Sequence, residues 1–198
     1  MKIYTPLCLL LAMTMLLATP AVAHELHGDS DTGEEHTRQV DDDRAFDDFI
    51  RAIDVVAPRE QLERRWPDVL DRLVDRATDS EATTFERRRA LSMLGMFPEP
   101  SAQQALMELT AESDERLRSL AFYTLGRFFV DRDDDRLLAH LETGLRDPSL
   151  SVRADVVRSL GWTPHPRART LLSEVINNAD DETLVQEAHR SLERLGRD

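Results

Sequence analysis

The sequence predicts an all-α fold, a right-handed α-solenoid (α-α superhelix) of about four helical pairs plus an N-terminal helix. The first observation behind this prediction is a repeat, because four amphipathic segments end in the dipeptide Leu-Gly. The four glycines are Gly95, Gly126, Gly161 and Gly196, which lie 31, 35 and 35 residues apart. The second observation is that apolar residues recur at helical spacing, and no stretch alternates with period two as a half-buried strand does. Self-similarity at such a period is typical of stacked repeats.

The first 23 residues have the pattern of a secretory signal peptide. Lys2 supplies a positive start, an apolar run extends from Leu7 to Ala18, and Ala21-Val22-Ala23 is a small-x-small cleavage pattern. The run is shorter than the roughly 20 residues that a membrane-spanning helix needs. We therefore expect cleavage after Ala23, a periplasmic or secreted location, and no membrane insertion of the mature chain.

Composition restricts the chemistry and the partners of the processed chain. Cys8 is the only cysteine and lies inside the apolar run, so disulfides and cysteine-based metal sites are excluded from residue 24 onward. Without Lys2 the chain keeps 24 arginines and no lysine, against 38 acidic residues. A net negative charge of this size argues against nucleic acid and anionic membranes as partners, since both favour basic surfaces.

Residues 24–43 form an acidic stretch with Leu26 and Val40 as its only large aliphatic residues. Such a composition predicts a disordered acidic tail. The tail holds His24, His27 and His36, and cleavage after Ala23 would place the amine and the imidazole of His24 together, a combination that chelates copper. We interpret these histidines as weak metal candidates only, because a mobile tail offers no fixed geometry. The remaining histidines, His140, His165 and His189, are interpreted as surface residues.

Apolar residues at helical spacing open the repeat domain, which we place at residues 44–198. The first helix is predicted from Phe46, Phe49, Ile50, Ile53 and Val56. Asp41 to Asp43 suit its N-terminus, and Pro58 ends it. Pro67 suits the first position of the next helix. The apolar stripe of that helix holds Leu70, Leu73, Val74 and Ala77.

Each Leu-Gly is expected to end the second helix of a pair. A glycine just past a helix suits the left-handed C-terminal cap, a conformation that other residues adopt only at a cost. A new apolar pair follows each of the first three glycines by ten to twelve residues, and we assign these pairs to the first helices of the following repeats. They are Ala105-Leu106, Leu137-Leu138 and Leu171-Leu172.

An acidic residue stands fourteen residues before each Leu-Gly glycine, and an arginine follows the first three acids by six residues. The three pairs are Glu81 with Arg87, Glu112 with Arg118, and Asp147 with Arg153. In this pattern the sequence resembles the HEAT-repeat family, in particular the short HEAT-like repeats also found in phycobilisome bilin lyases. The segment DPSLSVRADVVRSLG, from Asp147 to Gly161, matches best. The resemblance implies stacked helical pairs whose second helices line a concave surface, and we interpret the three pairs as a structural acid-Arg ladder between turns.

A partner-binding concave face is predicted from the positions of the second helices that do not face the core. These are Arg88, Arg89, Arg116, Tyr123, Asp155 and Arg158, with Arg127 and Trp162 just beyond two helix ends. Arginine, tyrosine and tryptophan often anchor protein interfaces, and a basic, aromatic stripe suits an acidic peptide or protein. Two alternatives stay open: the arginines are solvated surface groups, or Trp162, like Phe97, fastens a loop onto the next pair.

The sequence contains none of the common catalytic motifs. Gly-rich phosphate loops, a Ser-His-Asp set with an elbow motif and paired zinc-ligand motifs are all missing. We therefore expect a non-enzymatic protein-protein interaction scaffold or adaptor that needs no cofactor and is exported. The alternative hypothesis is a metal- or tetrapyrrole-handling accessory protein that uses the His-rich tail or the concave face.

Overall fold

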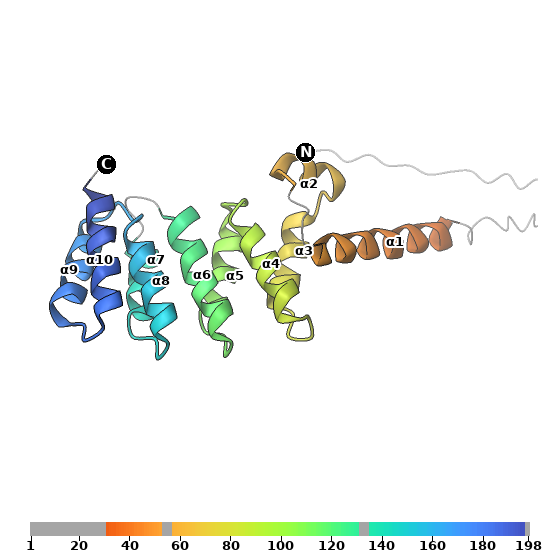
Figure 1. The fold of residues 1–198 in the computed structure, drawn as a ribbon. Helices are drawn as coiled ribbons and strands as arrows, with labels where there is room; N and C mark the ends of the chain where they lie inside the picture. Colours follow the sequence, from red (N-terminus) through yellow and green to blue (C-terminus); the bar gives the residue numbers. More distant parts are fainter. Residues whose placement is uncertain (1–30, 53–56, 131–134, 197–198) are drawn as a thin grey trace, which may run out of the picture. The chain divides into compact units, whose positions relative to one another are not determined.

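The computed structural model describes residues 31–52, 57–130 and 135–196, and side chains from residue 35 onward. The chain divides into two units, residues 1–43 and residues 44–198. Within the described ranges every regular element is a helix (Figure 1). The helices are α1 (Asp31–Arg51), α2 (Arg59–Arg65), α3 (Val69–Thr78), α4 (Thr84–Leu94), α5 (Pro100–Leu109), α6 (Glu115–Phe128), α7 (Asp135–Gly144), α8 (Leu150–Leu160), α9 (Pro166–Asn178) and α10 (Glu182–Leu195).

Helix α1 begins earlier than the sequence predicts. The prediction of a disordered tail is wrong for residues 31–43, which are helical, whereas residues 24–30 lie outside the described residues. Between Glu35 and Asp41 every side chain is exposed, so no core supports this stretch. Glutamate, glutamine and arginine are nevertheless good helix formers, and the Nε2 atom of Gln39 donates to Oδ1 of Asp43 one turn later. A lack of burial therefore does not prevent a local helix.

The second unit begins with a helical cap on the array. Phe46 and Ile50 of α1 are buried, and the ring of Phe46 meets the ring of Trp66 edge-on at 5.3 Å. Helix α2 is missing from the sequence prediction because seven residues with one buried leucine, Leu62, are too few to reveal a period. Helix α3 begins at Val69, two residues later than the start predicted from Pro67.

The four predicted pairs are confirmed: α3 with α4, α5 with α6, α7 with α8 and α9 with α10, arranged side by side in Figure 1. Each second helix begins at a side chain that accepts a backbone N–H and so satisfies an otherwise orphaned donor. These N-cap residues are Thr83, Asp114, Ser149 and Asp181. The second helices pack directly on one another, α4 on α6, α6 on α8 and α8 on α10, and one apolar core runs from Phe46 to Ala188.

The prediction of left-handed caps at the Leu-Gly glycines is wrong, and three of the four, Gly95, Gly126 and Gly161, lie at close contacts instead. Gly95, Gly161 and Gly196 have right-handed φ values of −61°, −70° and −91°. Gly126 lies inside α6, which continues to Phe128. A Cβ atom on Gly126 would meet the backbone Cα of Ser159 on α8 at 2.7 Å. The first three Leu-Gly glycines therefore mark the places where successive second helices approach each other.

Candidate functional site

The acid-Arg ladder exists, but its ion pairs join neighbouring repeats instead of residues six apart. Nη2 of Arg87 donates to Oε1 of Glu112 in the next turn at 2.5 Å. Arg118 binds Asp147 in the same way, with Nε donating to Oδ2 at 2.9 Å and Nη2 to Oδ1 at 3.1 Å. Glu81 is exposed at the start of the array. Arg87 and Arg118 each extend along the stacking direction, so each reaches the carboxylate in the turn of the next repeat instead of the one in its own turn.

Within its own repeat the ladder arginine binds backbone carbonyls. Nη1 of Arg118 donates to the carbonyl oxygens of Glu112 and Ser113, each at 2.8 Å. Nη1 of Arg153 donates to the carbonyl oxygen of Asp147 at 2.7 Å. The hydrogen bonds from Arg118 hold the pKa of the Asp147 carboxyl below its usual range, and the pKa of Arg118 is raised by the same pair. These residues link neighbouring repeats and fix the turns within them.

The second-helix face consists of those side chains of α4, α6, α8 and α10 that are directed away from the first helices. Arg88, Arg116 and Arg127, all predicted for this face, are exposed. Among the residues that the structure describes, none of the three makes a side-chain ion pair. Arg88 and Arg116 line a shallow hollow of about 200 Å³ together with Tyr123 and Asp155. Within the described part of the chain, these three guanidinium groups therefore have no carboxylate partner.

Asp155 and Arg158 belong to a network that ties three second helices together. Ser119 on α6 donates its hydroxyl to Asp155 on α8, and Nη1 of Arg158 donates to the same carboxylate. Nε of Arg158 reaches Oε1 of Glu187 on α10 at 3.3 Å, and Arg190 donates to Oε2 of Glu187 at 2.7 Å. Glu187 is 6% exposed. Arg158 and Asp155 are thus structural members of the face, and the sequence prediction did not separate them from the available arginines.

Trp162 lies between two arginines and a tyrosine. The Tyr123 ring meets it edge-on at 5.2 Å, and the guanidinium groups of Arg127 and Arg194 lie 5.4 and 5.0 Å from its centroid. Trp162 is half-buried, so part of the indole stays accessible. Phe97, its counterpart in the first repeat, is 1% exposed. The structure thus separates two positions that look equivalent in sequence, and of the two only Trp162, just after α8, borders the second-helix face.

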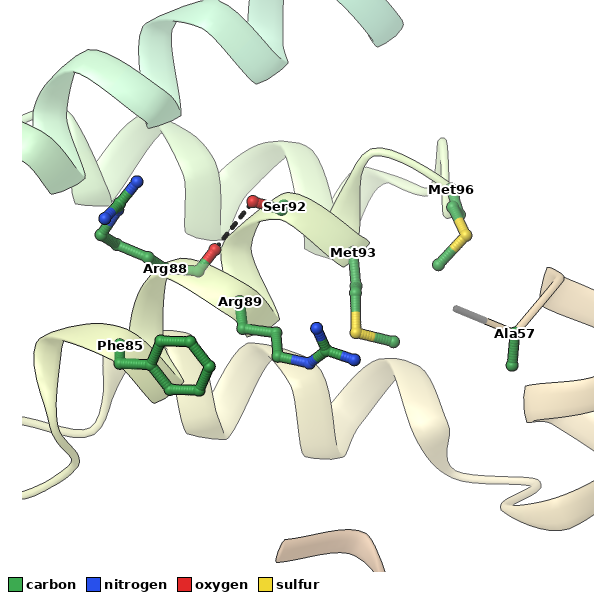
Figure 2. Close-up of a pocket in the computed structure, with 7 residues that line it drawn as sticks. All are labelled: Ala57, Phe85, Arg88, Arg89, Ser92, Met93 and Met96. Carbon is green, nitrogen blue, oxygen red and sulfur yellow. Dashed lines mark hydrogen bonds between the residues drawn. The ribbon is translucent and has the colours of Figure 1, made fainter. Parts of the chain in front are cut away.

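A hollow of about 400 Å³ adjoins α4 (Figure 2). We call it the α4 hollow, and it is lined by Ala57, Phe85, Arg88, Arg89, Ser92, Met93 and Met96. Phe85 is 47% exposed, which is unusual for an aromatic side chain. Arg89 also lies over the ring of Phe49 at 5.7 Å. Sequence reasoning named the two arginines but missed the apolar lining. The spacing of Phe85, Arg89 and Met93 at four residues was the signal that could have revealed it.

Behind this hollow, Glu86 anchors the start of α4 and is 5% exposed. Hydrogen bonds from the side chain and backbone of Thr83, followed by the bond from Arg51, lower its pKa from 4.5 to about 2. A depressed carboxyl pKa stabilises the folded state above the ordinary pKa, and this contribution is lost as the pH falls towards the folded value.

We therefore expect Glu86→Gln to remove part of the acid sensitivity of folding. Between pH 5 and pH 2 the free energy of unfolding of the wild type should fall by about 1 to 2 kcal/mol more than that of the variant. This is less than the full shift implies, because Arg51, with a side chain 58% exposed, is screened by water. Urea denaturation at several pH values measures it, and parallel curves would contradict the assignment.

The described histidines are not gathered into a site. His36 is exposed on α1, and His24 and His27 lie outside the described residues. No group of three metal-binding side chains occurs in the described ranges, and no described helix is long and apolar enough to cross a membrane. His140 is more than a surface residue, because it bonds Oγ1 of Thr110 at 2.8 Å and burial lowers its pKa. His165 is the N-cap of α9, and its Nδ1 accepts from a backbone N–H.

Comparisons with known proteins agree with this architecture. The sequence model of the HEAT repeats matches residues 70–149. Among solved structures the chain is similar to human deoxyhypusine hydroxylase in complex with glycerol, with a TM-score of 0.56 and 20% sequence identity. The similarity covers 65% of this chain but 44% of that chain, and at this identity it shows the fold alone. No curated protein sequence matches significantly. The predicted resemblance to HEAT repeats is confirmed over residues 70–149, and the predicted fold class is confirmed, because the described helical pairs form an α-solenoid.

Proposed function

We propose that this chain is an exported, non-enzymatic adaptor that holds an acidic protein or peptide on its second-helix face. The observation that carries the proposal is the set of exposed arginines on that face, Arg88, Arg116 and Arg127, which make no side-chain ion pair among the described residues. Arginine without a carboxylate partner of its own keeps its fork of donors for a carboxylate on another protein.

The charge of the whole chain supports an orienting role for this face. The formal net charge is −13, so an acidic partner is repelled by most of the surface. Complementary charge at one face then fixes the orientation of binding and speeds the encounter. Trp162 and Tyr123, in edge-on contact beside Arg127, add the kind of aromatic anchor that is frequent at interface hot spots.

Export is supported by the signal-peptide pattern in residues 1–23, which lie outside the described residues. Cell fractionation checks this part of the proposal. We expect the chain in the periplasm or medium, shortened by its first 23 residues. A full-length chain in the cytosol would contradict export.

The function is tested by reversing the three exposed arginines to glutamate and using the processed protein as bait in envelope extract. The wild type should retain a discrete partner, and the triple variant should lose it, because three attractive charges become repulsive. The bait is analysed for bound metal beforehand, since the alternative of a metal-handling tail with His24, His27 and His36 would give a loaded bait without a partner.

A matched control separates the face from net charge. Arg64, Arg136 and Arg146 are also exposed but lie on α2, on α7 and in the turn after α7. Reversing these three makes the same change in charge and should leave capture as in the wild type. Equal loss in both triple variants would mean that capture depends on overall charge, and retained capture in the Arg88, Arg116 and Arg127 variant would refute the face.

A further inference from the structure

The α4 hollow lies where a regular array of repeats would continue. Helix α6 packs between α4 and α8, and α8 packs between α6 and α10. In the described part of the chain, α4 and α10 are therefore the outermost second helices, each with one flank that no further second helix covers. The end of α1 covers part of the α4 flank, where Nε of Arg51 bonds Oε1 of Glu86 at 2.7 Å.

The two outermost flanks differ in chemistry. On α10 the exposed side chains are all polar: Glu182, Thr183, Gln186, His189, Arg190 and Glu193. A polar outer surface is what a terminal repeat needs in order to close an array in water. On α4 the corresponding region exposes Phe85 and leaves Met93 and Met96 half-buried beside a hollow. Helix α10 also has half-buried apolar side chains, Val185, Leu192 and Leu195, but of these two outermost helices only α4 exposes a large apolar side chain.

Two rows of side chains line this surface, and within each row the residues are four positions apart. One row is Phe85, Arg89 and Met93, and the other is Arg88, Ser92 and Met96. Figure 2 shows the first row on one side of α4, with Ala57 across the space near Met96. Residues four apart on a helix form a continuous ridge, and ridges of one helix pack into the grooves of another.

The charges at the α4 hollow restrict the occupant further. Among the described residues its lining contains Arg88 and Arg89 and no acidic residue, and Arg88 is the exposed one of the two. We propose that the α4 hollow binds an amphipathic helix of a partner protein, with an apolar row packed against Phe85 and Met93 and carboxylates beside Arg88. This helix packs on the part of the α4 flank that the end of α1 leaves uncovered. The inference rests on the proposed function, because it names the segment by which the acidic partner is held.

Synthetic helices test the inference with the processed full chain. The probe is a fluorescein-labelled, glutamate-rich peptide of about four turns with a row of leucines at helical spacing. Three control peptides replace the leucines by alanine, the glutamates by glutamine, or a central residue by proline. Anisotropy titrations should give saturable binding of the probe and weakening by about tenfold or more for each control, because each one removes the apolar row, the charge or the helix.

Variants locate the binding. Phe85→Ala and Arg88→Glu change exposed side chains and should leave the fold intact, which circular dichroism checks. Each substitution should weaken binding of the probe by about tenfold. Phe128→Ala is the matched control, because Phe128 is 48% exposed against 47% for Phe85 but lies outside the hollow, and it should bind as the wild type does.

Other occupants give other results. Equal binding of the proline peptide would exclude a helix, and dodecanoate that binds in the same place more tightly than the probe would assign the hollow to a small anionic amphiphile. A dimer that Phe85→Ala dissociates would assign it to a second copy of the chain. If the wild type captures an envelope partner but binds no probe, this inference fails while the proposed function stands. If the probe binds as described and no partner is captured, the proposed function fails alone.

Discussion

Gly126→Ala should lower the free energy of unfolding by about 3 kcal/mol, the largest effect expected of a single added methyl group in this chain. The added Cβ would lie 2.7 Å from the Cα of Ser159, a backbone atom that cannot rotate away. Ser159 is fully buried, and its hydroxyl donates to the carbonyl oxygen of Phe122 at 3.0 Å. Relief would therefore require α6 and α8 to separate, which also loosens their shared core. Urea denaturation of wild type and variant measures the difference.

The other repeat glycines provide graded controls for this prediction. On Gly161 a Cβ would meet Nη1 of Arg194 and the Cβ of Ser191, each at 2.7 Å. The Arg194 tip can shift, whereas the Ser191 Cβ moves only with its backbone, so the loss should be only somewhat smaller than at Gly126. On Gly196 the nearest atoms are carbonyl oxygens at 3.5 and 3.6 Å, which is ordinary contact. Gly196→Ala should be neutral or stabilising by about 0.5 kcal/mol, because alanine reduces the freedom of the unfolded chain. Equal losses at all three positions would mean that backbone conformation, not close packing, selects glycine.

The Leu-Gly repeats could be predicted from the sequence, whereas the structural role of their glycines could not. The period of the Leu-Gly segments and the helical spacing of apolar residues follow from local chain geometry, so the four pairs could be found from sequence. The partner of Gly126 is Ser159, 33 positions later on another helix. A glycine in the right-handed region looks the same in sequence as a left-handed cap, and only the contact distinguishes them.

The candidate site was also predicted only where it follows from local periodicity. The side of a helix on which a residue lies follows from its position in the helical period. Arg88, Arg116 and Arg127 were therefore predicted correctly at exposed positions of the second helices. Pairing depends on the distance between repeats, so the bonds that engage Arg158 were not visible in the sequence. Phe85 was missed because an aromatic residue at helical spacing is usually core.

Arg118→Ala should destabilise the fold by about 3 to 4 kcal/mol, because it leaves a carboxylate without its guanidinium. The side chains of Arg118 and Asp147 are 13% and 10% exposed. Two hydrogen bonds join them across neighbouring repeats, and two more join Arg118 to the carbonyl oxygens of its own turn. Arg118→Lys keeps the charge but cannot make the paired hydrogen bonds of a guanidinium group, so we expect an intermediate loss of stability. Arg153→Ala removes bonds to carbonyl oxygens alone and should cost about 1 kcal/mol.

The pH dependence distinguishes the ion pair from packing of the arginine stem. The pKa of Asp147 is lowered in the folded protein, first by the bond from Arg118, so the pair stabilises the fold above the ordinary aspartate pKa and loses its effect as the pH falls through the folded value. The difference between wild type and Arg118→Ala should therefore shrink in acid, whereas a pure packing loss would stay constant. The ion pair of Arg118 with Asp147 also joins the second repeat to the third, and the cooperativity of unfolding in a stacked array depends on such interfaces. We expect the variant to unfold over a broader urea range than the wild type, and an equally sharp transition with an unchanged midpoint would show that the ladder does not couple the repeats.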